Sequence, residues 1–297
     1  MRKLLNWLRR AQDREPATEK ATQSPVTSLE ATTGASPRVI TLLAELQRLA
    51  PWQGENLLAQ LCIGLKEDSA EETRYRAAEA LIMSVYPTYK FSEFGRLFLD
   101  DQAFLNYYRR FMDPNNWHSL DRKYTLDQLL KLVLHLGGDM AECGAYKGAS
   151  AYRMCLALRG TGKLVHLFDS FEGLSAPGKW DGDYWAEGRF QVPEETLQET
   201  LAEFDNYRVY RGWIPQRFGE VAERRFSFVH IDVDLYRPTL DSLEFFYPRT
   251  ASSGIILMDD YGVRACPGAK LAADEFFAGK PEPVALLTTG QAMVIKR

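Results

Sequence analysis

The stretch Phe228-Val-His-Ile-Asp-Val-Asp-Leu-Tyr236 joins a largely apolar run to two carboxylates, Asp232 and Asp234. A short apolar run with β-branched and aromatic residues, ended abruptly by charge, is typical of a buried strand. In open α/β sheets, ligands bind in the crevice outside the carboxyl ends of the strands. We therefore expect both aspartates to lie at such a crevice.

A second run of the same kind follows one helix later. Gly254-Ile-Ile-Leu-Met258 leads directly into Asp259-Asp260-Tyr261. Two buried strands that each end in carboxylates predict one shared pocket rich in oxygen atoms. Mg²⁺ prefers a few carboxylates and keeps positions open for water or substrate oxygens, so the pattern favours magnesium. We interpret His230, which lies inside the strand pattern, as a core histidine rather than a zinc ligand.

From residue 139 onward, short apolar strands alternate with helical segments. This alternation predicts an α/β fold with a doubly wound, mostly parallel sheet. The strands are expected at residues 140–143, 164–169, 208–211, 226–232, 254–259, 284–287 and 292–295. The helices are expected at residues 149–159, 194–204, 215–223, 239–247 and 268–277. The last two strands are joined through Thr288-Thr-Gly290 and are predicted to form a hairpin.

The composition restricts the classes of function. Of the 297 residues, 45% are hydrophobic and 26% are charged, which is typical of a chain with a packed core. The net charge of −4 gives no general electrostatic case for binding nucleic acid, which needs a basic face. The four cysteines form no C-x-x-C pair, which favours reduced thiols, and we expect a cytoplasmic location. No run approaches the roughly 20 apolar residues that a membrane-spanning helix needs.

The first 118 residues differ in character from the rest. Residues 1–10 are basic with interleaved Leu and Trp side chains, and three interpretations stay open: contact with an anionic membrane surface, docking on a partner, or a solvated helix. Residues 11–38 are predicted to be a disordered linker, because they cannot bury enough apolar surface to offset chain entropy. Residues 39–118 carry leucines at helical spacing and are predicted to be a helical accessory region.

Aromatic residues are dense between Tyr86 and Phe111, where residues 70–86 and 101–111 are predicted to be helical. Packing between helices, with a face for self-association, is favoured over a wall above an acceptor pocket. A breaker at Asp113-Pro-Asn-Asn116 follows. The third predicted domain, residues 119–297, then begins with an amphipathic helix.

The turn after the first predicted strand, Glu142-Cys-Gly-Ala-Tyr-Lys-Gly148, is suited to close approach of a ligand. Its two glycines permit a tight turn. The pattern is not the G-x-G-x-x-G of a pyrophosphate cradle, and it suits a ligand with an amino-acid end and a ribose. At the end of the next strand, Asp169 is placed to accept hydrogen bonds from both ribose hydroxyls, or else to cap a turn.

These residues, taken in order, carry a resemblance. The motifs are Glu142-Cys-Gly144, Gly148-x-Ser150, Phe168-Asp-Ser-Phe-Glu-Gly173, Gly212-Trp213, His230-Ile-Asp-Val-Asp-Leu-Tyr236, Asp259-Asp-Tyr261 and Pro267-Gly268. Together they resemble the macrocin O-methyltransferase family over about residues 119–297. The resemblance implies a class I, S-adenosylmethionine-dependent, magnesium-requiring sugar O-methyltransferase of antibiotic tailoring. It also implies a seven-stranded methyltransferase sheet with accessory helices.

The resemblance assigns roles to individual residues. Asp232, Asp259 and Asp260 would hold Mg²⁺, and Asp232 would also be the catalytic base. The acceptor would be a hydroxyl of a sugar or small natural product. Asp234 is expected to cap the next helix or to orient a ligand, with capping favoured. The residues expected to bind S-adenosylmethionine are Glu142, Gly144, Tyr146, Ser150, Asp169, Ser170, Phe171, Gly212 and Trp213.

Two features leave the identity of the methyl acceptor open. The long loop at residues 174–192 carries Trp180, Tyr184 and Trp185, which could stack on a sugar or aromatic ring, or could pin the loop. In the first turn, Ala145-Tyr146-Lys147 replaces the usual residues of the family, which affects how the methionine end of the cofactor is held.

Two other functions compete with methyl transfer. Asp232-Val-Asp234 matches the D-x-D pattern with which glycosyltransferases hold a metal and a nucleotide sugar, but that alternative gives Asp259-Asp260 and Glu142-Cys-Gly144 no task. The second alternative is a non-catalytic scaffold with a methyltransferase-like fold. A scaffold has no physical need to cluster three carboxylates.

Overall fold

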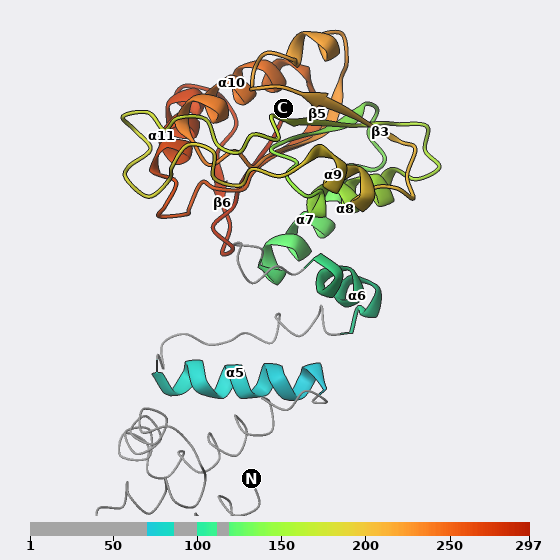
Figure 1. Cartoon of the computed structure of the whole chain (residues 1–297), viewed down its shortest axis with the longest axis vertical. Helices are drawn as coiled ribbons and strands as arrows, with labels where there is room; N and C mark the ends of the chain where they lie inside the picture. Colours follow the sequence, from blue (N-terminus) through green and yellow to red (C-terminus); the bar gives the residue numbers. More distant parts are fainter. Residues whose placement is uncertain (1–69, 86–99, 112–118) are drawn as a thin grey trace, which may run out of the picture. The chain divides into compact units, whose positions relative to one another are not determined.

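The structure is a computed structural model that describes residues 70–85, 100–111 and 119–297 (Figure 1). The chain divides into two compact units, residues 1–105 and 106–297. The predicted N-terminal helix, the linker and most of the accessory region lie outside the described residues, and the boundary expected at residue 119 stays a prediction. Two predicted accessory helices are confirmed as α5 (Glu71–Val85) and α6 (Gln102–Phe111).

A seven-stranded sheet organises the second unit (Figure 1). The strand order is β3-β2-β1-β4-β5-β7-β6, with parallel pairing throughout except at β7, which runs antiparallel to both β5 and β6. The predicted doubly wound, mostly parallel sheet and its terminal hairpin are therefore confirmed. The strands are β1 (Asp139–Cys143), β2 (Val165–Asp169), β3 (Tyr207–Arg211), β4 (Phe226–Ile231), β5 (Thr250–Met258), β6 (Ala285–Leu286) and β7 (Ala292–Ile295).

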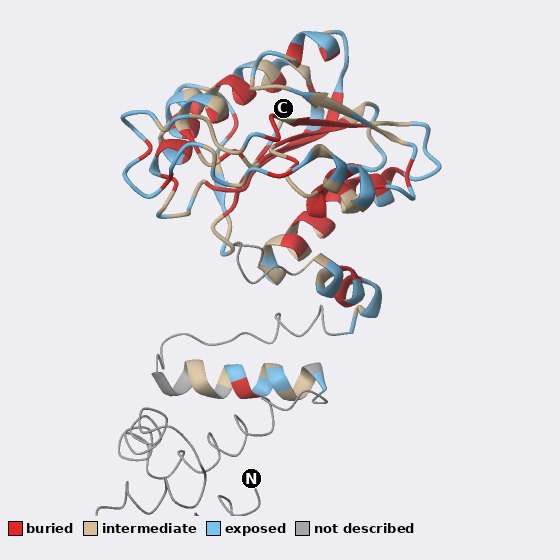
Figure 2. Cartoon of the chain, viewed as in Figure 1, coloured by how far each residue is buried: buried red, intermediate tan, exposed pale blue. Residues whose placement is uncertain are grey.

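Side chains alternate between two cores, one on each face of the sheet, because successive residues of a strand point to opposite sides. Met140 and Phe228 pack with α7 and α8 in one core, whereas Ala141 and Val229 pack with α10 and α11 in the other. All six residues of β4 are buried, and Figure 2 shows the burial concentrated in the sheet and the inner faces of the helices. The helices are α7 (Leu120–Val133), α8 (Ala149–Leu158), α9 (Glu194–Thr200), α10 (Tyr236–Phe246) and α11 (Pro267–Phe277).

Some predicted boundaries differ from the structure. The helix predicted at residues 215–223 is wrong: only a short 3-10 helix, η2 (Phe218–Val221), forms. Gly219 lies in its middle, and glycine costs about 1 kcal/mol relative to alanine inside an α-helix. The helix predicted at residues 194–204 ends at Thr200. Strand β5 starts four residues early, because a register shift in β4 lets Thr250 pair with Phe226.

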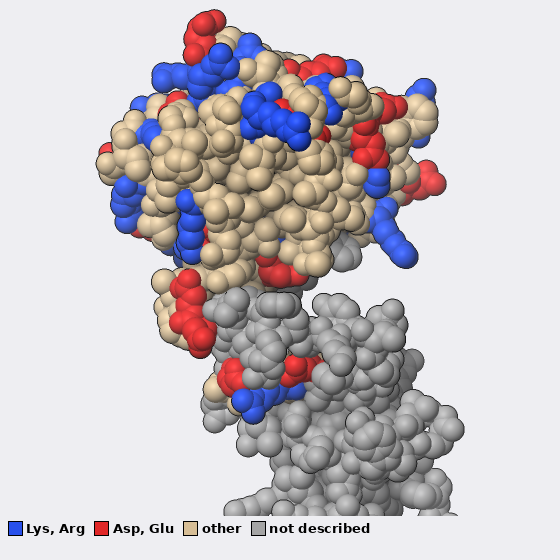
Figure 3. All heavy atoms as spheres, turned by 180° about the vertical axis from the view of Figure 1, so that it is seen from behind, with Lys and Arg blue, Asp and Glu red and all other residues tan. Residues whose placement is uncertain are grey.

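Figure 3 shows one face on which basic side chains are dispersed among acidic and uncharged ones. None of the described helices is long and apolar enough to cross a membrane. Absence of nucleic-acid binding, membrane contact by residues 1–10, self-association and a cytoplasmic location stay predictions.

Candidate functional site

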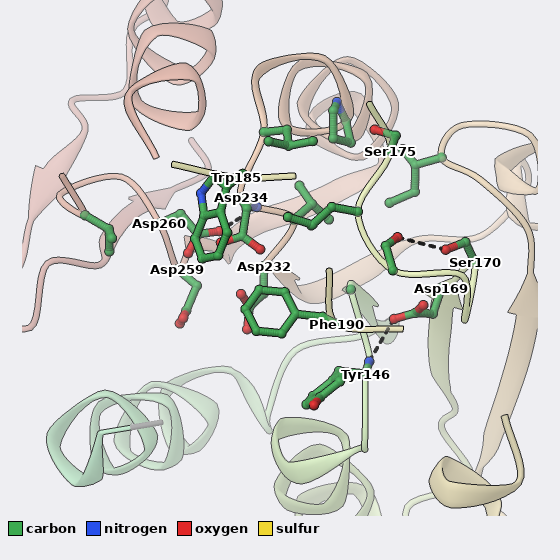
Figure 4. Close-up of a pocket in the computed structure, with 18 of the residues that line it drawn as sticks. Tyr146, Asp169, Ser170, Ser175, Trp185, Phe190, Asp232, Asp234, Asp259 and Asp260 are labelled. Carbon is green, nitrogen blue, oxygen red and sulfur yellow. Dashed lines mark hydrogen bonds between the residues drawn. The ribbon is translucent and has the colours of Figure 1, made fainter. Parts of the chain in front are cut away.

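A cavity of about 830 Å³ lies at the carboxyl ends of the parallel strands (Figure 4). The strand order reverses between β1 and β4, which is where ligands bind in open α/β sheets. Residues at or just after the ends of β1 to β5 line the cavity: Gly144, Asp169, Gly212, Asp232 and Asp259. The two motifs that opened the sequence analysis therefore meet in one pocket.

The turn after β1 brings the backbone of two strands together. Gly144 has φ +86°, and a Cβ atom there would collide with the carbonyl oxygen of Asp232. The backbone N–H of Asp232 in turn donates to the carbonyl of Cys143 at 2.9 Å. Glycine is required at this position, because it alone combines the left-handed backbone with the absence of a Cβ atom.

Asp169 anchors the opposite side of the cavity from the other aspartates (Figure 4). Its Oδ2 accepts from the backbone N–H of Tyr146 at 2.8 Å, and its Oδ1 accepts from that of Phe171 at 2.7 Å. Burial raises the pKa of Asp169, and the backbone hydrogen bonds limit the rise. The backbone N–H groups of Ala145 and Ser170 also act on this carboxylate, so Asp169 shapes the turn while it lines the cavity.

Four carboxylates gather on the other side of the cavity, as Figure 4 shows for Asp232, Asp234, Asp259 and Asp260. They form two groups whose ligating atoms lie within 4.8 Å of one another: His230 with Asp232 and Asp259, and Cys266 with Asp234 and Asp260. Of the three carboxylates expected to hold a metal, Asp232 and Asp259 thus share one group, whereas Asp260 lies in the other group with Asp234. Metal binding by the three stays a prediction.

Burial and mutual repulsion raise the pKa values of three carboxyl groups in the cluster. Burial and the charge of Asp259 raise the pKa of Asp232 to about 6. Burial and the charge of Asp232 raise the pKa of Asp234 to about 7. The pKa of Asp260 rises well above its ordinary value, through burial and the charges of Asp234 and Asp232. Negative charge is therefore in excess where these three side chains meet.

Asp259 differs, because donors from three parts of the chain hold it. Arg122 of α7 donates to Oδ2 and to the backbone carbonyl, while His230 and Gln291 donate to Oδ1 at 3.2 and 2.6 Å. Burial would raise the pKa of Asp259, but the Arg122 charge and the His230 hydrogen bond outweigh it and hold the pKa well below its usual range. Neither Arg122 nor Gln291 was predicted from the sequence to belong to the site.

His230 is a core histidine, as predicted, but it also links Glu142 on β1 to Asp259 at the end of β5. It is fully buried, and its Nδ1 lies 2.9 Å from Oε1 of Glu142, its register partner on β1. The other oxygen of Glu142 is buried and has no hydrogen-bond partner among the described residues. One polar chain thus runs from Glu142 through His230 to Asp259.

The predicted capping role of Asp234 is wrong. Helix α10 begins at Tyr236, and the carboxylate that accepts from the Tyr236 N–H, at 2.6 Å, belongs to Asp181. Asp234 has φ +59°, accepts a hydrogen bond from the Cys266 thiol at 3.4 Å and lines the cavity. The left-handed backbone turns the side chain toward the pocket rather than toward the helix end, which favours the alternative role of orienting a ligand.

The loop at residues 174–192 forms an aromatic wall of the cavity. Its ends pair with each other, since Leu174 and Arg189 are joined by a 2.8 Å backbone hydrogen bond. Asp181, 3% exposed, ties the middle of the loop to α10. The indole of Trp185 donates to the Cys266 thiol at 3.4 Å and lies beside the carboxylates. Trp185 therefore both pins the loop and lines the cavity, so the two interpretations of the aromatic loop are compatible.

The family model described as Macrocin-O-methyltransferase (TylF) matches residues 121–281, more than half of the chain. The chain belongs to the macrocin O-methyltransferase family. The match includes the turn after β1, the aromatic loop and all four carboxylates of the cluster, and it confirms the family resemblance found in the sequence.

Two curated O-methyltransferases are similar to this macrocin O-methyltransferase family protein. The 8-demethyl-8-(2,3-dimethoxy-alpha-L-rhamnosyl)-tetracenomycin-C 4'-O-methyltransferase of Streptomyces olivaceus is 31% identical over 166 residues, which are 50% of this chain and 64% of that enzyme. The demethyldecarbamoylnovobiocin O-methyltransferase of Streptomyces niveus is 27% identical over 188 residues, 56% of this chain and 70% of that enzyme. The first match thus spans less than two thirds of its relative.

Solved structures support the fold. The O-methyltransferase NovP superposes with a TM-score of 0.53 at 24% identity, covering 62% of this chain and 84% of NovP. The calicheamicin methyltransferase CalS11 superposes with a TM-score of 0.54 at 21% identity, covering 77% of this chain and 94% of CalS11. The predicted class I methyltransferase sheet is therefore confirmed for this family member.

The residues expected to bind a cofactor in this family divide into two sets. Six of them line the cavity: Gly144, Tyr146, Asp169, Ser170, Gly212 and Trp213. The other three are buried behind it: Glu142 contacts His230, Ser150 accepts from Lys123 Nζ at 2.6 Å, and Phe171 packs in the core. Cofactor binding by either set stays a prediction.

Proposed function

We propose that this chain is an S-adenosylmethionine-dependent O-methyltransferase that acts on a hydroxyl of a sugar or small natural product. The observation that carries the proposal is the single cavity with Asp169 on one side and four carboxylates on the other. A nucleoside-binding acid and a proton-accepting cluster are the two parts that methyl transfer from a sulfonium donor to a hydroxyl requires. The names of the two curated relatives support an O-methyltransferase, and the name of the tetracenomycin enzyme, with its rhamnosyl group, supports a glycosylated acceptor.

The residues present fit the cofactor. Asp169 lines the cavity as an acceptor for the ribose hydroxyls, and Gly144 leaves the backbone open to close approach. The unpartnered oxygen of Glu142 needs a donor such as an ammonium group or a water, because an unsatisfied buried carboxylate oxygen is costly. When bound, the cofactor would supply the methyl group on a positively charged sulfur.

The donor set also fits a divalent cation. Asp232, Asp259 and Asp260 would hold it, since a hard cation such as Mg²⁺ prefers carboxylate oxygens and would relieve their mutual repulsion. When bound, the cation would lower the pKa of an acceptor hydroxyl. Arg122 engages two of these carboxylates in the present structure.

The chain's own side chains can take the acceptor's proton. Asp232 is the proposed base, with its pKa raised to about 6, and Asp234 lines the same cavity with its pKa raised to about 7. A general base works best when its pKa lies near the working pH. The aromatic loop, pinned by Asp181 and Trp185, would hold the acceptor over these carboxylates and exclude water.

A screen with a labelled methyl donor tests the proposal. Purified full-length protein is incubated with methyl-labelled S-adenosylmethionine and a panel of hydroxylated acceptors, with Mg²⁺ or with EDTA. Label transfer to a sugar or natural-product hydroxyl is expected, and EDTA is expected to stop it. Calorimetric heat with UDP-glucose but not with S-adenosylmethionine would instead favour the glycosyltransferase, and binding without any turnover would favour a scaffold.

Replacing Asp169 with alanine is expected to weaken cofactor binding by about 1–3 kcal/mol, because the ribose hydroxyls lose their partner. Calorimetric titration with S-adenosylhomocysteine measures this change. Glu172→Ala, an exposed acid three residues away, is the matched control and is expected to bind like the wild type. An unchanged dissociation constant for Asp169→Ala would remove this residue from the cofactor site.

Replacing Asp181 with alanine is expected to loosen the aromatic loop. The change removes the acceptor of the Tyr236 and Gly178 N–H groups, at 2.6 and 2.7 Å, and loss of a helix cap costs about 1 kcal/mol. Limited proteolysis is expected to cut residues 174–192 faster, and the acceptor KM is expected to rise while cofactor affinity stays the same. Asp183→Ala, exposed in the same loop, is the control. Equal proteolysis of the two variants would show that Asp181 does not hold the loop.

A further inference from the structure

Arg122 reaches the carboxylate cluster from the first turn of α7. Ser119 caps this helix by accepting the Arg122 backbone N–H at 3.4 Å, and both residues line the cavity. Because α7 packs against β4 and β5, its N-terminus lies over the ends of these strands. The Arg122 side chain is only 12% exposed, so its charge is directed into the site rather than into solvent.

The guanidinium occupies the carboxylate oxygens that a cation would need. It forms an ion pair with Oδ2 of Asp259 and lies 3.6 Å from Oδ1 of Asp260. The Oδ1 atom of Asp259 is already held by His230 and Gln291. A metal ion bound by Asp259 and Asp260 would therefore have to take over the position of Arg122, while the His230 and Gln291 hydrogen bonds could remain.

Arg122 is not fully satisfied where it lies. Its Nε is buried and has no hydrogen-bond partner among the described residues. An arginine that served only as a structural ion pair would be expected to use its planar set of donors more completely. Arg122 thus forms an ion pair with Asp259 but leaves one of its hydrogen-bond donors unsatisfied. We expect such a group to be displaced more readily than a fully hydrogen-bonded one.

We propose that Arg122 is an internal counter-ion that competes with a divalent cation for Asp259 and Asp260. The inference rests on the cation site of the proposed function. Without a cation, the guanidinium neutralises carboxylates that would otherwise repel one another at the ends of β4 and β5. When a cation binds, Arg122 leaves these oxygens. Removing Arg122 therefore has two opposite effects: the cation-free protein loses stability, and the affinity for the cation rises.

Direct binding of Mn²⁺, a spectroscopic substitute for Mg²⁺, tests the proposal without any activity assay. Free Mn²⁺ is counted by electron paramagnetic resonance during titration of the full-length wild type and of Arg122→Gln. We expect Arg122→Gln to bind Mn²⁺ about tenfold more tightly, because it no longer exchanges a charge-assisted hydrogen bond for the metal. Without a cation, the melting temperature of Arg122→Gln is expected to be lower than that of the wild type. On addition of Mn²⁺, the melting temperature of Arg122→Gln is expected to rise by more than that of the wild type.

Lys131→Gln is the matched control. Lys131 is exposed at the far end of the same helix, and its replacement removes the same charge as Arg122→Gln does. It is expected to bind Mn²⁺ within about twofold of the wild type, because exposed charges at a distance are screened. Arg122→Lys, which keeps the charge but loses the planar set of donors, serves if Arg122→Gln does not fold. It is expected to bind Mn²⁺ more tightly than the wild type, by a smaller factor.

The outcomes separate this proposal from the proposed function. Unchanged or weaker Mn²⁺ binding by Arg122→Gln or Arg122→Lys, with binding by the wild type, overturns the competition and leaves the cation site standing. A gain of equal size in Lys131→Gln also overturns it, because the effect would then be one of overall charge. If neither wild type nor variant binds Mn²⁺, both the competition and the cation site fail, whereas methyl transfer in EDTA reports separately on the methyltransferase.

Discussion

Turnover is expected to fall by at least about 10²–10³-fold when Asp259 is replaced with asparagine, the range observed when one preorganised electrostatic group is removed from an active site. Asp259 is the carboxylate on which Arg122, His230 and Gln291 converge. The amide would keep an acceptor for one of these groups but would lose the charge that a cation or the Arg122 guanidinium needs. Cofactor affinity is expected to change little, because Asp169 lies on the other side of the cavity.

Two measurements on one sample decide this prediction: initial rates with a labelled methyl donor, and calorimetric titration with S-adenosylhomocysteine. Asp205→Asn, an exposed aspartate before β3, makes the same chemical change away from the site and is expected to retain wild-type rates. Equal loss of turnover and cofactor binding in Asp259→Asn, accompanied by a lower melting temperature, would instead show that Asp259 serves folding.

The parts of the site that could be predicted are those encoded by local pattern. A buried strand followed by carboxylates is visible within a few residues, as in the run that ends at Asp232 and in the one that ends at Asp259. Parallel strands place their carboxyl ends at one edge of a sheet, so the convergence of these residues follows from the βαβ alternation alone. The same holds for Asp169 after β2.

The parts that could not be predicted depend on contacts between distant segments. Arg122 is separated from Asp259 by 137 positions, and Asp181 from Tyr236 by 55. For the contact between Arg122 and Asp259, one local indication was present in the sequence. Arg122 and Lys123 occupy the first turn of a helix, where the helix dipole disfavours cations, so a pair of basic residues there needs a negative partner.

The misassignment of Asp234 has a similar cause. Aspartate is a favoured N-cap residue and Asp234 lies shortly before the helix, so the local sequence favours that interpretation. The cap is instead supplied by Asp181 from the long loop, which frees Asp234 to turn into the cavity with φ +59°. Competition between two aspartates for one helix end is decided by the path of the loop, which sequence pattern does not encode.

Replacing His230 with phenylalanine is expected to lower the free energy of unfolding by about 3–5 kcal/mol, the range for removing one partner of a buried ionic pair. The ring would still fill the space between β1 and β5. Glu142 would lose its hydrogen-bond partner at 2.9 Å, and Asp259 would lose one of its three donors. His230→Gln keeps one donor and is expected to cost less. Urea unfolding with EDTA present measures both variants.

The dependence of the free energy of unfolding on pH also tests the role of His230. Burial alone would lower the pKa of His230, but the hydrogen bonds from its ring to Asp259 and Glu142 outweigh burial and raise the pKa to about 10. A raised pKa means that the folded protein holds a proton that the unfolded chain releases. The stabilisation is therefore complete below the unfolded value of about 6.5 and is lost as the pH rises from there through about 10.

The wild type is accordingly expected to lose stability between pH 6.5 and 10 relative to His230→Phe, which has no imidazole to titrate. The raised pKa values of Asp232 and Asp234, about 6 and 7, act mainly at lower pH, and the charge of His230 lowers the pKa of Asp232. The difference between the two curves at higher pH therefore reports His230 together with the carboxylate that it influences. His135→Gln, which changes an exposed histidine of the same unit, is expected to leave the curve unchanged. A constant difference between wild type and His230→Phe over this pH range would mean that the ring is neutral when folded. One of the carboxyl groups on either side of it would then have to carry the proton instead, because two ionised carboxylates cannot both be hydrogen-bonded by a neutral imidazole.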